Sequence, residues 1–380
     1  MIFCKNAIMS TFLIVNIAMR VNGFRIFPSK ILQRGGGVFS NYLSSTTSLS
    51  GYTILDPPTS SASNNKNTER NLQSVLHTAE KAAHKAGEIM VQTSGKISIS
   101  KTKANAADLV TESDLECQRI IKEIVKSECP EDYFLGEEDV EAGSFASSTA
   151  LENALRRSPS DEDNEMRESK LLWVVDPIDG TTNFQAGLPM FCVSIGVVLL
   201  EPDEEPEVIA GVIYNPVLDE MVSAVRGRGC YVNGKRLHNN FDDRAKKLDY
   251  DEAGLSLDKA LVNVGFPVYS EGTLRASSRA VTALATKVRG LRMIASASQV
   301  MSWVAQGKLN AYVSWDLNAW DIAAGMIIVE ESGGFISDFE GNRGSILTRD
   351  MIISCNEGNS KHELSKAILQ VLKENDCLQY

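Results

Sequence analysis

Leu171-Leu-Trp-Val-Val-Asp-Pro-Ile-Asp-Gly-Thr-Thr-Asn-Phe184 is the stretch of sequence that decides the fold. Its apolar run, 171–175, ends in two carboxylates, Asp176 and Asp179, and is followed by Gly180 and two threonines. We therefore expect a buried strand that carries acids at its own C-terminal end. Two carboxylates at the edge of a low-dielectric core repel each other and lose hydration, so the arrangement needs a compensating charge.

A divalent cation is the simplest compensating charge. Mg²⁺ takes oxygen ligands, and the carbonyl of Ile178 lies between the two acids. Gly180 and Thr181 offer backbone N–H groups where a helix can begin, which is typical of an anion site. Taken alone, Asp-Pro-x-Asp-Gly is also typical of an ordinary acidic turn. The hypothesis of a metal and phosphate site therefore depends on the other acids of the chain.

Two more apolar segments place acids beside their ends. The run 133–136 predicts a strand that is followed by Glu137 and Glu138. Asp321 opens a long apolar helix that Gly333-Gly334 should stop, although the helix dipole alone would stabilise an acid there.

Asp114 lies near the start of another predicted helix, where Ser113 and Glu116 predict a capping box. The other expected elements are helices over 71–93 and 275–288, strands over 96–100, 191–200, 208–214, 261–266, 309–315 and 351–354, a hairpin over 220–237 that turns at Asn233-Gly234, and a C-terminal helix through Leu372.

Four motifs resemble those of the inositol monophosphatase family, which are lithium-sensitive, magnesium-dependent phosphomonoesterases. They are Asp-Leu-Val-Thr-Glu-Ser-Asp (108–114), Gly-Glu-Glu (136–138), Asp-Pro-Ile-Asp-Gly-Thr-Thr-Asn-Phe (176–184) and Trp-Asp-Ile-Ala-Ala-Gly (320–325), in the family's order. The resemblance extends from about Asn71 to the C-terminus. It implies the α+β layered sandwich of inositol monophosphatases and fructose bisphosphatases, with alternating α-β-α-β-α layers and the site at their junction.

The resemblance also implies a role for each motif residue. Two to three Mg²⁺ ions would be bound: the first by Glu137, Asp176 and the Ile178 carbonyl, the second by Asp176, Asp179 and Asp321, and a weaker third near Glu137. Asp114 and Thr181 would orient and deprotonate the attacking water. Substrate contacts would come from Asp179, Gly180, Thr181, Ser296, Ala297 and Asp321. Lys103 would correspond to a lysine near the metals, and Glu138 would support the site.

One position departs from the family. Its inositol enzymes commonly carry a glutamate seven residues before the last aspartate, and Ser314 stands there instead. The leading prediction is Mg²⁺-dependent hydrolysis of a small phosphate monoester, above all myo-inositol monophosphate. Histidinol phosphate, a sugar phosphate and a phosphoadenosine nucleotide are the alternatives. A catalytically retired regulatory homologue is a different class, but no metal carboxylate is missing and Thr181 is present.

The N-terminal segment has the composition of a targeting presequence. The first 55 residues contain no Asp or Glu, an apolar run spans 7–21, and a Ser-rich basic stretch follows Phe24. We predict a presequence and linker over 1–65, with a plastid favoured slightly over a mitochondrion or the secretory pathway. The catalytic domain would then cover 66–380, with the metal site in an N-terminal half, 66–235, and a C-terminal half over 236–380.

Charge and composition limit the classes of partner and of metal site that we expect. The net charge of −11 argues against nucleic acid, and no membrane association is expected of the mature domain. The seven cysteines form no CxxC pair and the four histidines lie outside the motifs, which argues against zinc sites and histidine triads. The polar segment 140–170 is expected to be a mobile insertion, with a flap over the site as the alternative, and no function is assigned to it. The resemblance implies a homodimer.

Overall fold

The computed structural model describes residues 72–96, 101–102, 109–156, 169–201, 204–237, 255–266, 270–358 and 362–380. All of them belong to one compact unit, Thr59–Tyr380. The predicted presequence, Lys103 and most of the strand predicted over 96–100 lie outside the described residues. Within the described part of the chain, no helix is both long enough and apolar enough to cross a membrane.

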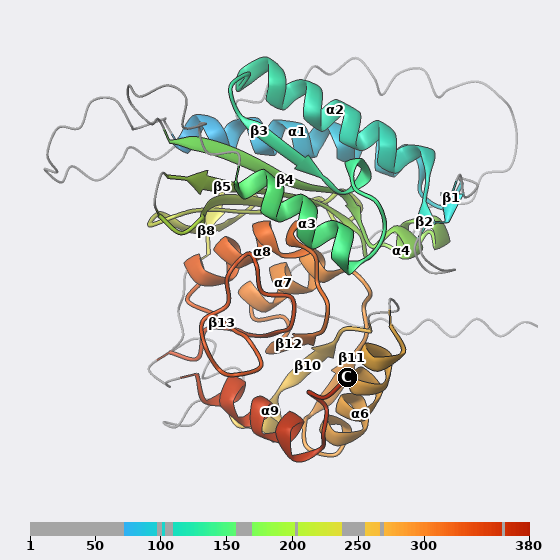
Figure 1. Ribbon diagram of the computed structural model, residues 1–380, viewed down its shortest axis with the longest axis vertical. Helices are drawn as coiled ribbons and strands as arrows, with labels where there is room; N and C mark the ends of the chain where they lie inside the picture. Colours follow the sequence, from blue (N-terminus) through green and yellow to red (C-terminus); the bar gives the residue numbers. More distant parts are fainter. Residues whose placement is uncertain are drawn as a thin grey trace, which may run out of the picture. The chain divides into compact units, whose positions relative to one another are not determined.

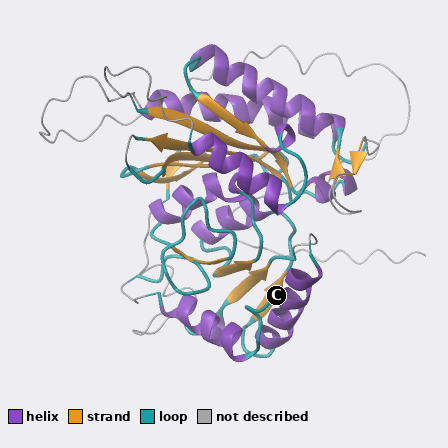
Figure 2. Ribbon diagram, viewed as in Figure 1, coloured by secondary structure: helices purple, strands orange, loops and turns teal. Residues whose placement is uncertain are grey.

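The apolar run 171–175 and both acids that follow it lie in the second strand of a seven-stranded sheet, and the strands of the molecule are orange in Figure 2. The order of this sheet is β3 (Tyr133–Gly136), β4 (Lys170–Asp179), β5 (Cys192–Leu200), β6 (Glu207–Asn215), β7 (Glu220–Val225), β8 (Gly229–Val232) and β9 (Lys235–Arg236). Only β3 and β4 are parallel, and all later neighbours are antiparallel. Alternate residues of β4 enter two different cores, which explains why its sequence is continuously apolar.

Two helices, α1 (Leu72–Thr93) and α2 (Glu112–Glu128), cover one face of this sheet (Figure 1). The capping box predicted from Ser113 and Glu116 is wrong. Thr111 caps α2 instead, and its backbone N–H donates to Asp114 Oδ2 at 2.8 Å. Glu116 is left on the surface, where it pairs with Arg119 at 2.7 Å.

The opposite face of the sheet packs on α7 (Ala297–Ala305) and α8 (Ala319–Glu331). Two glycines let α8 approach the strands closely. A Cβ on Gly196 of β5 would lie 2.5 Å from Ala323 Cβ, and one on Gly211 of β6 would lie 2.7 Å from the Ala324 carbonyl oxygen. Any side chain at either position would push α8 away from the sheet.

A five-stranded sheet covers the far side of these two helices. Its order is β11 (Gly290–Arg292), β10 (Leu261–Val264), β12 (Ala311–Ser314), β14 (Met351–Ser354) and β13 (Phe335–Ser337). The last layer is formed by α6 (Glu271–Ala285) and α9 (Glu363–Glu374), which share a third core with this sheet. The predicted five layers, α-β-α-β-α, are confirmed (Figure 1).

The segment expected to be a mobile insertion contains a helix. This helix, α3 (Ser144–Leu155), packs Leu151 and Ala154, both 5% exposed, against the core around α8. Two buried apolar residues in twelve are too few to show a helical period in the sequence, which is why the prediction is wrong over 144–155. The remaining short elements are β1 (Lys101–Thr102), β2 (Leu109–Val110), η1 (Glu137–Asp139), α4 (Thr181–Ala186) and η2 (Leu257–Lys259).

Candidate active site

The end of β4 delivers two buried acids. Asp176 is 3% exposed and Asp179 is 6% exposed, and a register shift in the pairing with β5 lies between them. The chain then turns at Gly180, whose φ of 91° is left-handed. A Cβ there would lie 2.9 Å from the Met190 carbonyl oxygen, so both the turn and the close packing require glycine.

Asp114 and Thr181 meet beside this turn. The hydroxyl of Thr181 lies 3.1 Å from the Ile178 carbonyl oxygen and 3.4 Å from Asp114 Oδ1. The hydroxyl has one proton to donate, and the shorter contact is the one to Ile178. Burial raises the pKa of Asp114 to about 6, although hydrogen bonds from Thr111 oppose the rise. Asp114 therefore completes the capping box of α2 with Thr111 and also lies next to the hydroxyl of Thr181.

Asp179 links β4 to the first turn of α7, more than 100 residues later. It accepts hydrogen bonds from Ser296 Oγ at 2.8 Å and from the backbone N–H groups of Ala297 at 3.1 Å and Ser298 at 2.6 Å. Burial still raises its pKa. Ser296 and Ala297, which were predicted to contact substrate, thus contact Asp179.

Asp321 lies in the first turn of α8, as predicted. Its Oδ2 accepts the backbone N–H of the cap residue Asn318 at 2.7 Å, and its own carbonyl accepts the Ser298 hydroxyl at 2.8 Å. Burial raises the pKa of Asp321 well above its usual range, and the charges of Asp179 and Glu137 raise it further. Ser298 in the first turn of α7 therefore contacts both acids: its backbone N–H binds the Asp179 carboxylate and its hydroxyl binds the Asp321 carbonyl.

Glu137 and Glu138 follow β3 in η1, and both are partly buried. The Glu138 backbone N–H donates to Gln118 Oε1 of α2 at 2.9 Å. Glu137 is part of one electrostatic group with the other acids. The pKa of Asp176 is raised well above its usual range by burial, and then by the charges of Glu137, Asp179, Asp321 and Asp114. Acids from three other segments, Asp114, Glu137 and Asp321, therefore act electrostatically on Asp176 together with Asp179 of its own strand.

The donor set fits a hard divalent cation, because the gathered side chains are carboxylates and the negative charge is concentrated. The thiol of Cys192 lies 3.7 Å from Asp179 Oδ2, but burial and the charges of Asp179 and Asp176 raise its pKa, so it stays protonated. Among the described residues, however, no three His, Cys, Asp or Glu side chains are grouped closely enough to hold one ion.

Ser314, the position that departs from the family, is buried beside the acids. Its hydroxyl hydrogen-bonds with that of Tyr312, whose pKa is raised by burial and by the charges of Asp179 and Asp321. The side of the site formed by β12 thus presents neutral hydroxyl groups.

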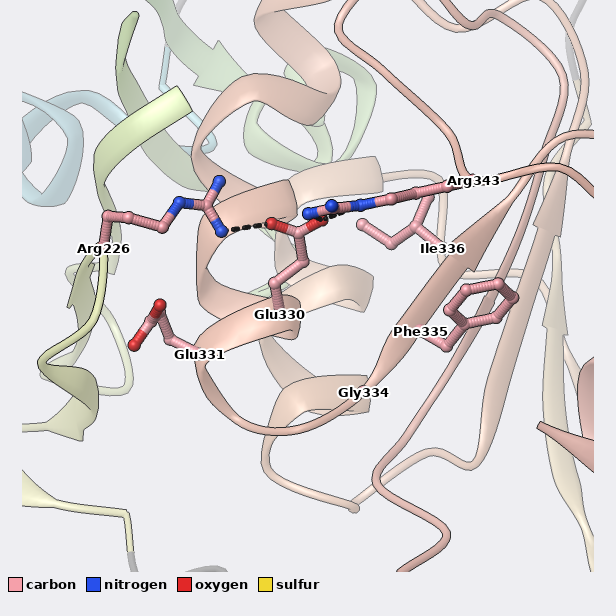
Figure 3. Close-up of a pocket in the computed structure, with 7 residues that line it drawn as sticks. All are labelled: Arg226, Glu330, Glu331, Gly334, Phe335, Ile336 and Arg343. Carbon is pink, nitrogen blue, oxygen red and sulfur yellow. Dashed lines mark hydrogen bonds and ion pairs between the residues drawn. The ribbon is translucent and has the colours of Figure 1, made fainter. Parts of the chain in front are cut away.

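A pocket of about 310 Å³ lies at the opposite end of α8 (Figure 3). It is lined by Arg226, Glu330, Glu331, Gly334, Phe335, Ile336 and Arg343. Glu330 pairs with Arg226 at 2.5 Å and with Arg343 at 2.6 Å. Because both guanidinium groups are already paired with a carboxylate, this pocket is a poor phosphate site. Glu330 lies nine positions after Asp321 in α8, which is a rise of about 14 Å along the helix.

Sequence reasoning missed several residues that orient the acids. Thr111-x-x-Asp114 and Asn318-x-x-Asp321 both have the spacing of a capping box, a signal that was available. Ser298 and Arg349 gave no comparable signal, because their contacts come from the tertiary fold.

Comparison with known proteins gives consistent matches. A sequence model described as the inositol monophosphatase family matches residues 71–375. Inositol monophosphatase 3 of Solanum lycopersicum is 34% identical over 281 residues, which cover 73% of this chain and 91% of that protein. A Thermotoga maritima protein named fructose-1,6-bisphosphatase/inositol-1-monophosphatase is 28% identical over 294 residues, 77% of this chain and 95% of its own. The solved structure of a Thermotoga maritima IMPase matches with a TM-score of 0.58 and 27% identity, and covers 79% of this chain and 98% of that one.

Proposed function

The chain belongs to the inositol monophosphatase family, and on that premise we propose that it hydrolyses a small phosphate monoester, above all a myo-inositol monophosphate, with Mg²⁺ as its metal. The observation that carries the proposal is the gathering of Glu137, Asp179, Asp321 and Asp114 around the buried Asp176. So many carboxylates would be too costly to bury together without bound cations. A phosphate dianion needs the same cations before a nucleophile can approach it.

The metal ligands in this proposal are Glu137, Asp176, the Ile178 carbonyl, Asp179 and Asp321. When bound, divalent cations neutralise phosphoryl oxygens and make water a better nucleophile at neutral pH. The carboxylates that are apart in this structure would draw together around them.

The attacking water is oriented by Thr181 and Asp114 in this proposal. The pKa of Asp114, about 6, suits a group that takes a proton near neutral pH. A proton would reach Asp114 through the Thr181 hydroxyl, which lies 3.4 Å from Asp114 Oδ1, when that hydroxyl turns from the Ile178 carbonyl toward Asp114. The N–H groups of Gly180 and Thr181 would bind phosphoryl oxygens, and Ser296, Ala297 and Asp179 would contact the alcohol of the substrate.

Because Ser314 replaces the glutamate common in the family's inositol enzymes, the alcohol part of the substrate could differ from inositol. The wall that Ser314 forms with Tyr312 is neutral, so it would also accept an alcohol with an anionic group, as in a sugar bisphosphate. The name of the Thermotoga maritima relative includes both fructose-1,6-bisphosphatase and inositol-1-monophosphatase. Histidinol phosphate and phosphoadenosine nucleotides remain alternatives for the same reaction. A retired homologue is disfavoured, because all the matched carboxylates and Thr181 are present.

Phosphate release tests the proposal directly. The substrates would be inositol monophosphates, histidinol phosphate, fructose bisphosphate and phosphoadenosine phosphate, each with and without Mg²⁺ and Li⁺. We expect Mg²⁺-dependent release that is greatest with an inositol monophosphate and inhibited by Li⁺. Asp179→Asn should nearly abolish turnover with the fold retained, whereas Asp338→Asn, at an exposed turn, should not. Near-normal hydrolysis by Asp179→Asn, or no release from any substrate, would contradict the proposal.

Two further expectations extend the proposal beyond the site. The family match begins at residue 71, which supports a separate targeting role for 1–65. A fluorescent protein fused to residues 1–65 should enter an organelle, with the plastid favoured, and cytosolic fluorescence would contradict this. By analogy with the family we also propose a homodimer, which sedimentation of the mature protein would test.

A further inference from the structure

The start of α8 is held by one guanidinium group. Arg349 lies in the segment before β14, and its side chain is 24% exposed. Its Nε donates to Asp316 Oδ1 at 2.7 Å, and one Nη donates to Asn318 Oδ1 at 3.0 Å. Asn318 caps α8 and donates its backbone N–H to Asp321 at 2.7 Å. A chain of contacts therefore runs from Arg349 through Asn318 to the Asp321 carboxylate.

The same guanidinium reaches α3. Its other Nη donates to Ser147 Oγ at 3.1 Å and to Ser148 Oγ at 3.3 Å. Ser144 completes the group by donating to Asp316 Oδ2 at 2.5 Å. Because α3 begins five residues after η1 ends, these contacts tie the segment that carries Glu137 to the helix that carries Asp321.

The connection between β12 and α8 needs this support. Asp316 has a φ of 53°, a left-handed conformation that a residue with a side chain adopts at a cost of about 1 kcal/mol. The backbone N–H of Leu317 donates to the Arg349 carbonyl at 2.8 Å, so Arg349 holds the connection by its backbone as well. Arg349 is also the cation whose charge opposes the rise in the pKa of Asp321.

We propose that Arg349 is a positioning residue for the metal-binding carboxylate of Asp321, and that α3 shares this role through its three serines. The inference rests on the proposed function, because it requires Asp321 to bind Mg²⁺. Without the guanidinium, the side chain of Asn318 loses its hydrogen bond from Arg349 and the connection is freer to move. Mutation of a residue that hydrogen-bonds to a metal ligand typically weakens metal binding 10- to 100-fold.

Magnesium binding, rather than activity alone, is the readout that tests this role. We would titrate the mature protein with Mg²⁺ and record the rise in melting temperature. For Arg349→Met, the Mg²⁺ concentration that gives half of that rise should increase at least about tenfold. The kcat at saturating Mg²⁺ should recover to nearly the original value. Arg349→Lys keeps the charge but cannot make every hydrogen bond, so its midpoint should be intermediate.

Two further variants control the experiment. Arg343→Met breaks an ion pair at the other end of α8, where Arg343 bonds to Glu330, and should leave the Mg²⁺ midpoint unchanged. Asn318→Ala keeps the ion pair of Arg349 with Asp316 but removes the hydrogen bond that Arg349 donates to the cap residue. It should raise the midpoint too, and it tests the proposal even if Arg349→Met does not fold.

The outcomes separate the two proposals. If the original protein is neither stabilised by Mg²⁺ nor active with it, the proposed function fails. If it is stabilised and active, but Arg349→Met and Asn318→Ala keep its Mg²⁺ midpoint and only melt earlier, Arg349 is merely structural and the positioning role is overturned.

Discussion

The buried Asp114 carboxylate should destabilise the metal-free protein when it is ionised, and Asp114→Asn should remove this cost. Burial raises the pKa of Asp114 from 3.8 to about 6 in the folded state. The native state therefore binds this proton more tightly than the unfolded state does. Its stability is greatest below pH 4 as far as Asp114 is concerned, and falls as the pH rises toward 6 and beyond.

The size of the effect follows from the two pKa values. A difference of about 2 corresponds to about 3 kcal/mol at 1.36 kcal/mol for each tenfold change. The neutral asparagine can still accept the hydrogen bond from the Thr111 backbone, but it loses up to about 1 kcal/mol of favourable interaction with the helix dipole. The net gain at pH 8 is then about 2 kcal/mol, or about 4–8 °C in melting temperature.

The assay is the melting temperature in EDTA from pH 4.5 to 8. The melting temperature of the variant should exceed that of the original protein at pH 8, the difference should shrink steadily as the pH falls to 4.5, and the variant should release phosphate poorly. Glu116→Gln is the matched control, because Glu116 is an exposed acid in the same helix and its pKa is lowered by Arg119. If Asp114→Asn melts at or below the original temperature at pH 8, or if the two pH profiles are parallel, burial does not raise the pKa of Asp114 as described.

Three other perturbations have expected outcomes. Gly196→Ala should lower the free energy of unfolding by at least about 1–3 kcal/mol in urea, because its Cβ would overlap Ala323, whereas Gly290→Ala, with its nearest contact at 3.4 Å, should cost less than 1 kcal/mol. Equal costs would refute the close contact with α8. Thr181→Ala should reduce kcat by about 10²- to 10⁴-fold, with much of the activity kept by Thr181→Ser, because the hydroxyl is the functional group. Equal losses in the two variants would contradict this. Ser314→Glu should lower kcat/KM for fructose bisphosphate relative to inositol monophosphate, and an unchanged ratio would remove Ser314 from the substrate wall.

The strands near the site could be predicted because their own residues are apolar wherever the strand is buried. Residues 171–175 are apolar on both faces of β4, since one face packs under α1 and α2 and the other under α7 and α8. The hairpin turn at Asn233-Gly234 was equally predictable, because both residues adopt the positive φ that such a turn requires.

The contacts that orient the acids could not be predicted in the same way. Asp179 is held by Ser298, 119 positions away, and nothing in the local pattern specifies that pair. The contacts of the α3 serines were equally unpredictable, because their partners, Asp316 and Arg349, lie far along the chain.

The long separation between Asp179 and its partners on α7 has a consequence for folding. Asp321 can join the other acids only after the first sheet has received α7 and α8, which are made more than 100 residues after Asp179 in synthesis. Closing so long a loop is slow and yields contacts late, so a partly folded chain would have no cage for a cation. Added magnesium should therefore slow the unfolding of the finished protein and leave its rate of refolding almost untouched.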